Sequence, residues 1–449
     1  RFPLDVSGGV ARFRHRRGVL ERLLVEVPFG ELAVWAAPRL RGLVSADTPE
    51  VRVLPGEGAL TVVVAEPPRV SAGARPVAVL AFEVVPAVDG PAVAIGIDGA
   101  RGVGLPEPAW ALALRAVRGL LGAVAQGEGA WIRVEALARE IGRRLLPEAG
   151  ARAPDAESLT WEASSVTGDA WVLQGRLGAP PPAPEERTAS AREATRLAAA
   201  ADEALLRGGD SSLPAARDAA LRALELAPRH RGLVRRIADI DRHVGGRAEA
   251  ALALLAEAAG PAEAADALLV AALREEAGRA PGDIAAAYLR AGELERGPRL
   301  AAEALALAAT HAPSDDDALD LLDRALGRAP RASEIRWRRV ERRLARGRVD
   351  DALADVEQLE AQAEGPPAKH AVWRRAGALV RSSRAAAEAA VLFERALRYV
   401  PDEPSSLAGL GAALVAEGRA SRGVALLLRA VARAEELGED ASAARLALA

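Results

Sequence analysis

The sequence predicts an α+β domain followed by an all-α superhelical solenoid, and three observations support this fold class. Val- and Leu-rich runs separated by turn residues dominate residues 1–178. From 185 to 449 the strand signals vanish, and helical segments rich in Ala, Leu, Arg and Glu follow one another. Between these regions, the proline-rich stretch 179–184 is typical of a stiff, exposed linker. We therefore expect two domains, 1–178 and 185–449, joined by this linker.

The first part of the α+β domain carries the patterns of several strands. Strands are expected at 24–34, 51–54, 59–65, 77–85 and 92–97. The Asp-Gly pair at 89–90 favours a hairpin between the last two of these strands.

Helices and a second hairpin are expected to follow. Pro106 and Pro108 begin an apolar helix that continues to about residue 124, because proline is well tolerated in a first helical turn. A second helix is expected at 134–146, and a hairpin at 160–165 and 170–177. This order indicates an α+β domain and not the alternating βαβ order of a nucleotide-binding sheet.

Composition and charge argue against several function classes. The chain has 59 basic and 62 acidic residues, a net charge of −3, and residues 1–178 hold 20 of each. Neither half is a polycation, so general nucleic-acid binding is not expected. The absence of Cys excludes disulfides, thiolate metal sites and a cysteine nucleophile. No HExxH or HxH spacing occurs among the five histidines, so we predict no metal site: His15, His230, His243, His311 and His370. We also predict no cofactor and no catalytic residues.

The missing residue types point to the source of the chain. Lys369 is the only lysine, and Asn and Met are absent, which is typical of a GC-rich bacterial genome. Because there is no Met, we expect a segment to precede Arg1, and the compartment (bacterial cytoplasm or periplasm) stays open. No uncharged apolar run approaches about 18 residues, so no membrane span is predicted.

A sequence repeat with a period near 34 residues organises the C-terminal region. Counting His370 as position 1, large and small residues alternate in a fixed order at positions 4, 7, 8, 11, 20, 24, 27 and 32: Trp373, Ala376, Gly377, Val380, Ala389, Phe393, Ala396 and Pro401. Stretches starting at 299, 334 and 404 keep this register. The pattern resembles the tetratricopeptide repeat (TPR) family, most clearly over 299–437. Residues 230–298 are helical without an assignable register.

The spacing has a physical reason. Gly377 and Ala389 fall where two helices of a pair would cross, and small residues let the two backbones approach. Trp373, Val380 and Phe393 would fill the space around that crossing, and Pro401 would end the second helix. We therefore expect a TPR-like superhelical solenoid.

The TPR resemblance implies a protein partner, a peptide or a helix, bound in a groove lined by the first helix of each repeat. The implied groove positions hold arginines that would form one stripe and could pair with carboxylates of an acidic partner: Arg338, Arg342, Arg346, Arg374 and Arg381. The carboxylate-clamp subtype needs Asn at position 9, where this chain has Arg342, Ala378 or Ala412. The alternative is a solvated helix face balanced by nearby acids.

Three further segments invite a functional interpretation. The Arg-rich run 336–348 resembles a nucleic-acid-binding segment, but Trp337 occupies a core position and would not stack on bases. The glycine-rich segment 96–104 fits no phosphate-binding motif and is interpreted as a connecting loop. Three acids at 315–317 are expected to begin a helix, where they complement its dipole, and not to bind a metal.

Two function classes stay open. The first is an interaction protein, in which the solenoid docks a partner and scaffolds an assembly. The second is a carrier for a lipid or other apolar ligand in the bacterial envelope, held by the Val- and Leu-rich α+β domain. The basic run at 12–17 could also touch a phosphate or an anionic membrane surface, although no motif supports membrane or lipid binding. No indicator of an enzyme is present.

Overall fold

The computed structural model describes ten segments of the chain, and all structural statements below concern them: 22–44, 48–56, 58–67, 77–89, 92–134, 159–177, 189–209, 211–258, 263–382 and 386–448. The predicted helix at 134–146, the basic run at 12–17 and the linker at 179–184 lie outside these segments, apart from Val134. The linker boundary therefore stays a prediction.

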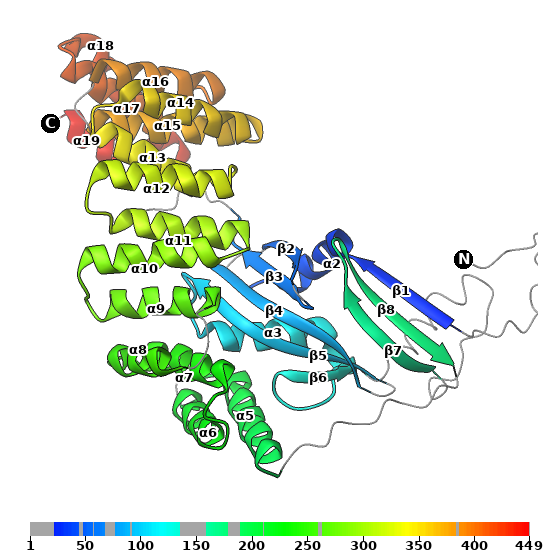
Figure 1. The fold of residues 1–449 in the computed structure, drawn as a ribbon. Helices are drawn as coiled ribbons and strands as arrows, with labels where there is room; N and C mark the ends of the chain where they lie inside the picture. Colours follow the sequence, from blue (N-terminus) through cyan, green and yellow to red (C-terminus); the bar gives the residue numbers. More distant parts are fainter. Residues whose placement is uncertain are drawn as a thin grey trace, which may run out of the picture. The chain divides into compact units, whose positions relative to one another are not determined.

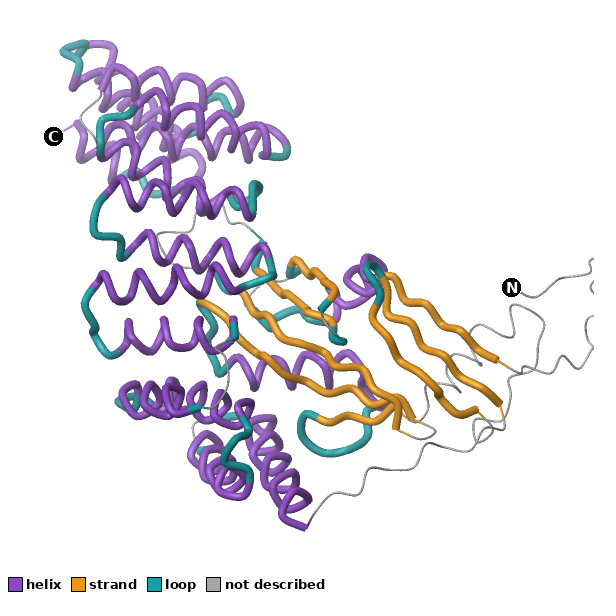
Figure 2. The backbone as a smooth tube through the Cα atoms, in the orientation of Figure 1, coloured by secondary structure: helices purple, strands orange, loops and turns teal. Residues whose placement is uncertain are grey.

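Five antiparallel strands form the larger sheet (Figures 1 and 2). Their order in space is also their order along the chain: β2 (Glu50–Pro55), β3 (Leu60–Ala65), β4 (Val79–Asp89), β5 (Ala92–Val103) and β6 (Trp131–Val134). The predicted strands at 51–54, 59–65, 77–85 and 92–97 are all present, and Asp89 pairs with Ala92 in the expected hairpin.

The course of strand β5 shows that one sequence-based prediction was wrong. The glycine-rich segment 96–104, interpreted as a connecting loop, is strand through Val103 and pairs with β4. The register shifts between Ala81 and Glu83, and Gly99 takes a φ of +58°, which favours glycine. A Cβ at Gly102 would lie 2.5 Å from the Val79 carbonyl oxygen. The glycines therefore permit an irregular, closely paired strand, and their number misled the loop prediction.

Helix α3 (Ala109–Leu121) packs on this sheet, as its apolar face predicted, and the short 3₁₀ turn η2 (Gly122–Val124) follows it. Leu114 from the helix and Leu80 and Phe82 from β4 are fully buried in the same core. This core also includes Leu205 and Ile240, which belong to helices beyond the predicted linker. The sheet and those helices therefore share apolar packing.

A three-stranded sheet has the order β1 (Arg22–Pro28), β8 (Ala170–Leu177) and β7 (Leu159–Val166). The predicted hairpin around 167–169 is present, with the Thr167 N–H donating to the Ala170 carbonyl at 2.8 Å. The predicted strand at 24–34 is only partly correct. It ends at Pro28, after which α2 (Phe29–Ala36) and the 3₁₀ turn η1 (Ala37–Arg39) follow. Proline immediately before a helix is favourable, and this signal was missed.

The remaining described elements are helices, and within each unit neighbouring helices pack against one another. We number them as alternating first and second helices along the chain. The first helices of the pairs are α5 (Ala189–Arg207), α7 (Arg231–Val244), α9 (Ala264–Glu276), α11 (Pro298–Thr310), α13 (Ser333–Ala345), α15 (Gly365–Ser382) and α17 (Pro404–Ala416). The second helices are α6 (Ser212–Leu226), α8 (Ala248–Glu257), α10 (Pro281–Leu294), α12 (Asp315–Arg328), α14 (Val349–Gln362), α16 (Ala386–Tyr399) and α18 (Ala420–Leu437), and α19 (Ser442–Leu448) ends the described chain.

The helix pairs confirm the predicted register. Repeats expected to start at 299, 334 and 404 have first helices that begin at Pro298, Ser333 and Pro404, whereas the repeat expected at 370 has a first helix that already begins at Gly365. A Cβ at Gly377 would lie 3.1 Å from the Phe393 ring, so the predicted small residue does sit at the helix crossing. Residues 230–298, which sequence alone could not phase, form α7 to α10 in the same alternation.

The chain divides into two compact units, and each is described by itself. Unit 1 comprises Arg1–Pro67, Ala78–Arg279 and Arg290–Leu300, and so contains both sheets and helices α5 to α9. Unit 2 comprises Pro68–Val77, Ala280–Leu289 and Ala301–Ala449. Of the helices described, none is long and apolar enough to cross a membrane.

Candidate protein-binding face of the helix pairs

In unit 1, the first helices of the pairs hold the chain's own sheet domain. Trp110, in the first turn of α3, makes the central contacts. Its indole N–H donates to Asp202 of α5 at 2.6 Å, and its backbone N–H donates to Asp239 of α7 at 3.0 Å. The guanidinium of Arg236 lies 3.9 Å above the Trp110 ring. One aromatic residue thus joins α3 to two helices of the array.

Asp239 caps α3 from another element. Pro108, which precedes this helix, offers no side-chain cap, and Asp239 accepts from the N–H groups of the first turn. A carboxylate there complements the positive end of the helix dipole. Burial raises the pKa of Asp239, and it also raises the pKa of Asp202 despite the neighbouring Arg236.

A buried ion pair forms a second link in unit 1. Arg101 of β5 donates through Nε and Nη2 to the two carboxylate oxygens of Glu295, at 2.5 and 3.0 Å. Both side chains are at most 5% exposed. Arg101 also donates to the Gly99 carbonyl at 2.6 Å, and Glu295 accepts from the Gly297 N–H at 2.9 Å. Such a bidentate, fully hydrogen-bonded pair fixes the two segments relative to each other.

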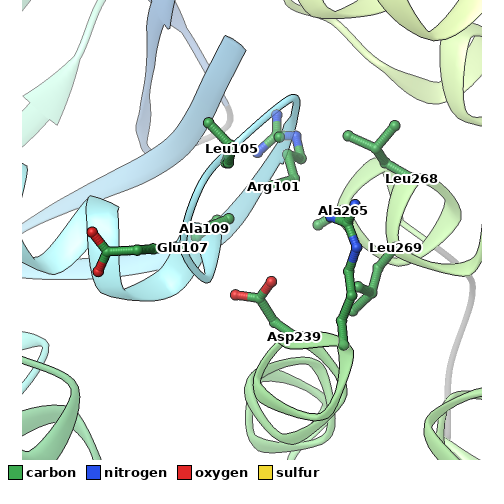
Figure 3. Close-up of a pocket in the computed structure, with 11 residues that line it drawn as sticks. Arg101, Leu105, Glu107, Ala109, Asp239, Ala265, Leu268 and Leu269 are labelled. Atoms are coloured by element: carbon green, nitrogen blue, oxygen red, sulfur yellow. The ribbon is translucent and has the colours of Figure 1, made fainter. Parts of the chain in front are cut away.

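Figure 3 shows the small space left at this junction, with Arg101 from β5, Asp239 from α7 and Leu268 from α9 around it. Its volume is about 20 Å³. A space of that size holds a water molecule or little more. At this point the side chains of α7 and α9 therefore pack closely against the sheet domain.

The predicted arginines Arg338 and Arg342 lie on α13 in unit 2, Arg346 immediately follows this helix, and acids of α12 lie opposite two of the three. Arg342 pairs with Asp315 at 2.8 Å, and Arg346 pairs with Asp316 at 3.2 Å. All four side chains are between 35% and 72% exposed. Arg338 is half-buried and has interactions within the chain. The structure thus shows acids facing two members of the predicted stripe.

The predicted arginines of α15 differ in their surroundings. Arg381 is exposed near the end of the helix. Arg374 is half-buried, and its positive charge helps to lower the pKa of His370, although burial of the imidazole is the larger cause. Both remain proposed contact residues, because their positions in the first helix of a repeat are as expected.

The acids at 315–317 begin α12, as predicted. Ser314 caps this helix by accepting from the Asp317 N–H at 3.1 Å. Across the segments the structure describes, no group of three or more His, Cys, Asp or Glu side chains could hold a metal ion. The acids therefore serve the helix start and the arginines of α13.

The Arg-rich segment 336–348 has a mainly structural arrangement. Trp337 is buried, as predicted, so its ring is not available for stacking on bases. Three arginines of α13 converge on the buried carboxylate of Asp355 in α14: Arg336, Arg339 and Arg343. Sequence reasoning missed Asp355, because a single acid in an acid-rich helix gives no signal.

A Ser–His–Glu cluster in unit 2 was also missed. His370 Nε2 lies 2.9 Å from Ser406 Oγ and 3.3 Å from a Glu403 oxygen. Glu403 in turn caps α17 by accepting from the Ser406 N–H at 2.7 Å. A catalytic triad needs the acid and the serine on different ring nitrogens, whereas here one nitrogen contacts both. Ser406 is also fully buried, so the cluster holds helices together.

The paired helices and their sequence register make the C-terminal region a TPR-like repeat stack. No protein-family model matches the sequence, and no curated protein matches it.

Three solved structures are similar in their helices. A tetratricopeptide repeat protein from Parabacteroides merdae covers 57% of this chain and 98% of its own, at 16% identity and a TM-score of 0.36. The TPR2AB domain of yeast Sti1, in a complex with pHSP90, covers 57% and 95%, at 14% identity and 0.22. Yeast Tom70 covers 59% and 66%, at 16% identity and 0.23. These likenesses carry no ligand or partner over to this chain.

Proposed function

We propose that the protein is a scaffold that binds an acidic segment of a partner protein along α13 and α15. The single observation that carries this proposal is that two partly exposed arginines at the end of α13 form ion pairs with acids at the start of α12 that are also partly exposed. Arg342 and Arg346 pair with Asp315 and Asp316, and none of these side chains is buried.

A carboxylate of a partner can replace Asp315 or Asp316 in these ion pairs at little cost in free energy. An exposed ion pair contributes about 0–1 kcal/mol, so replacing Asp315 or Asp316 by another carboxylate costs little. A partner carboxylate can bind an arginine through two parallel hydrogen bonds. Several such contacts, extended to Arg374 and Arg381 on α15, would add up along an acidic segment.

The contacts of unit 1 support the placing of the partner site on α13 and α15. In that unit the corresponding helices α5, α7 and α9 hold the sheet domain through Trp110 and Asp239. The sheet domain is then a fixed part of the scaffold, joined to the first repeats by buried contacts.

A peptide titration tests the proposal. We expect a fluorescein-labelled peptide alternating Glu and Ala to bind the full chain, and its Gln–Ala counterpart to bind far more weakly. Reversing three charges (Arg338→Glu, Arg342→Glu, Arg346→Glu) should abolish binding. Arg422→Glu with Arg429→Glu is the matched control, since these exposed arginines lie on α18 and pair with Glu394 and Asp402.

Removing Asp315 and Asp316 distinguishes a binding site for an acidic segment from a solvated helix face. The double variant Asp315→Asn, Asp316→Asn leaves Arg342 and Arg346 without their partners on α12. If the arginines bind an acidic segment, this variant should bind the Glu–Ala peptide more tightly, by about threefold to tenfold. Unchanged affinity in this variant and in the charge-reversed variant would show a solvated face and no site.

Identification of the natural partner requires affinity purification from the native host. We expect the full chain to retain a protein that the charge-reversed variant loses. If the charge-reversed variant retains the same protein as the unchanged chain, the proposed site is wrong.

The lipid-carrier alternative stays a prediction. The core of the larger sheet is filled by its own side chains, including Phe82, Trp110 and Leu114. Native mass spectrometry of the purified chain tests the alternative, because co-purified lipid would favour it.

A further inference from the structure

A cleft of about 790 Å³ lies in unit 1, apart from the arginine stripe. Its walls come from β5 and β6, from the loop before β6, and from α5 and α7. Small-molecule sites in proteins have volumes of about 300–1,000 Å³ and mostly apolar linings. The size of this cleft, hereafter the Trp131 cleft, falls in that range.

Trp131 forms one wall of the cleft. It stands on β6, pairs with Gly96 of β5, and is 43% exposed. A Cβ at Gly96 would lie 3.2 Å from the indole ring, so the glycine lets that ring lie against the strand. The exposed side of the indole is therefore a flat, supported apolar surface.

Helix α5 forms another wall. Ala191, Ala194 and Ala198 line the cleft at a spacing that keeps them on one helix face. Ile97 and Leu233 add apolar surface from β5 and α7. Because alanine has no side chain beyond Cβ, this wall leaves room for an inserted group.

The charged groups around the cleft are balanced. Three acidic and three basic side chains line the cleft: Asp98, Glu128, Asp202, Arg133, Arg196 and Arg236. Of these, Asp202 pairs with Arg236 at 3.5 Å. No excess of one sign is left to attract an ion. An uncharged occupant is therefore complementary to the cleft.

One polar group is fixed at the cleft. His230 accepts from the Leu233 N–H at Nδ1, so its proton sits on Nε2, which can donate a hydrogen bond. Burial is the main cause that lowers the pKa of His230, so the ring is neutral near pH 7. An acceptor atom on a ligand would complement this N–H.

We propose that the Trp131 cleft binds an uncharged organic molecule with an apolar aromatic ring that stacks on Trp131. This site is separate from the proposed partner site on α13 and α15, so either proposal can fail without the other. The probe for the test is N-phenyl-1-naphthylamine, an uncharged aromatic dye whose emission increases in apolar surroundings.

The full chain should bind this dye saturably. Trp131→Ala should weaken binding by at least about tenfold, and Trp131→Phe should retain most of it. Trp35→Ala is the matched control, because Trp35 is 40% exposed and lies outside the cleft, and it should leave the affinity unchanged. Ala198→Leu should also weaken binding by filling the cleft from the α5 wall.

Two results would overturn the proposal. The first is equal affinity in Trp131→Ala, Ala198→Leu and Trp35→Ala, which would show that the dye binds elsewhere. The second is tighter binding of the sulfonated counterpart of the dye, 1-anilinonaphthalene-8-sulfonate, which would contradict an uncharged occupant. A thermal unfolding scan of each variant shows whether it is folded. If Trp131→Ala does not fold, the affinity of Ala198→Leu decides the outcome.

Discussion

The Arg101–Glu295 pair gives the sharpest prediction about how the sheet domain is held. Glu295→Gln keeps the shape of the side chain and removes its charge. Arg101, which is 5% exposed, would keep its bond to the Gly99 carbonyl but lose the carboxylate that neutralises it. The perturbation therefore leaves a buried guanidinium whose remaining acidic neighbour is Glu83, which lies 3.8 Å away and is 42% exposed.

The expected cost follows from this burial. Removing one member of a buried ion pair costs about 3–5 kcal/mol, because the remaining charge stays desolvated. An exposed pair provides the control: Glu436→Gln, opposite Arg433, should cost at most about 0.5 kcal/mol, since Glu436 is 62% exposed. Replacing both buried partners, Arg101→Met with Glu295→Leu, should recover most of the stability, because no buried charge is then left.

Urea unfolding followed by circular dichroism measures these differences. We expect Glu295→Gln to move the transition of unit 1 to lower urea, with the double variant close to the unchanged chain. A loss below about 1 kcal/mol in Glu295→Gln, similar to that of the exposed control, would refute the argument. A double variant less stable than Glu295→Gln would also refute it.

Three further predictions concern unit 2 and the cleft. Gly409→Ala should destabilise the array by about 1–3 kcal/mol in urea unfolding, because the new Cβ would lie 2.4 Å from the Phe393 ring. Gly418→Ala is the control: its Cβ would meet no atom within 4 Å, so the only cost is that of alanine at a positive φ. Burial lowers the pKa of His370 in the folded chain, so below about pH 6.5 the unfolded chain binds a proton at this histidine more readily than the folded chain does. The free energy of unfolding should therefore fall as the pH drops. His370→Gln should make that fall less steep, and an unchanged pH profile in this variant would contradict the prediction. Dye binding should fall in Trp131→Ala and persist in Trp35→Ala, as argued above.

The repeat register could be predicted because it is written in local sequence. Gly377 and Phe393 must be small and large at a fixed spacing for two helices to cross, and a similar close approach occurs at Gly411, where a Cβ would lie 2.8 Å from Leu427. The hairpins at 89–92 and 167–170 were likewise signalled by short turn sequences. The errors occurred where a single residue changes the structure, as Pro28 does at the start of α2 and Gly102 within β5.

The docking of the sheet domain on α5, α7 and α9 could not be predicted. Trp110 is 92 residues from Asp202 and 129 from Asp239, and Arg101 is 194 residues from Glu295. Each of these acids is one among many in the helical region, so nothing in the sequence distinguishes it. The Trp131 cleft has the same origin, because its walls come from segments far apart along the chain.

The sequence predicted part of the surroundings of the arginine stripe, and the structure adds the acids that lie opposite it. The register placed Arg338 and Arg342 on the first helix of a repeat, whereas Arg346 is the residue that immediately follows this helix. It did not show that Asp315 and Asp316 of α12 lie opposite two of them. Any acidic partner must therefore compete with these acids, which makes their removal informative.

Hydrogen exchange of the full chain with and without the Glu–Ala peptide tests the central proposal most directly. The account predicts slower exchange in α13 and α15 when the peptide is present, and no change in α5, α7 and α9, where the sheet domain is already bound. Slower exchange in α5, α7 or α9, or no change in α13 and α15 at saturating peptide, would contradict it.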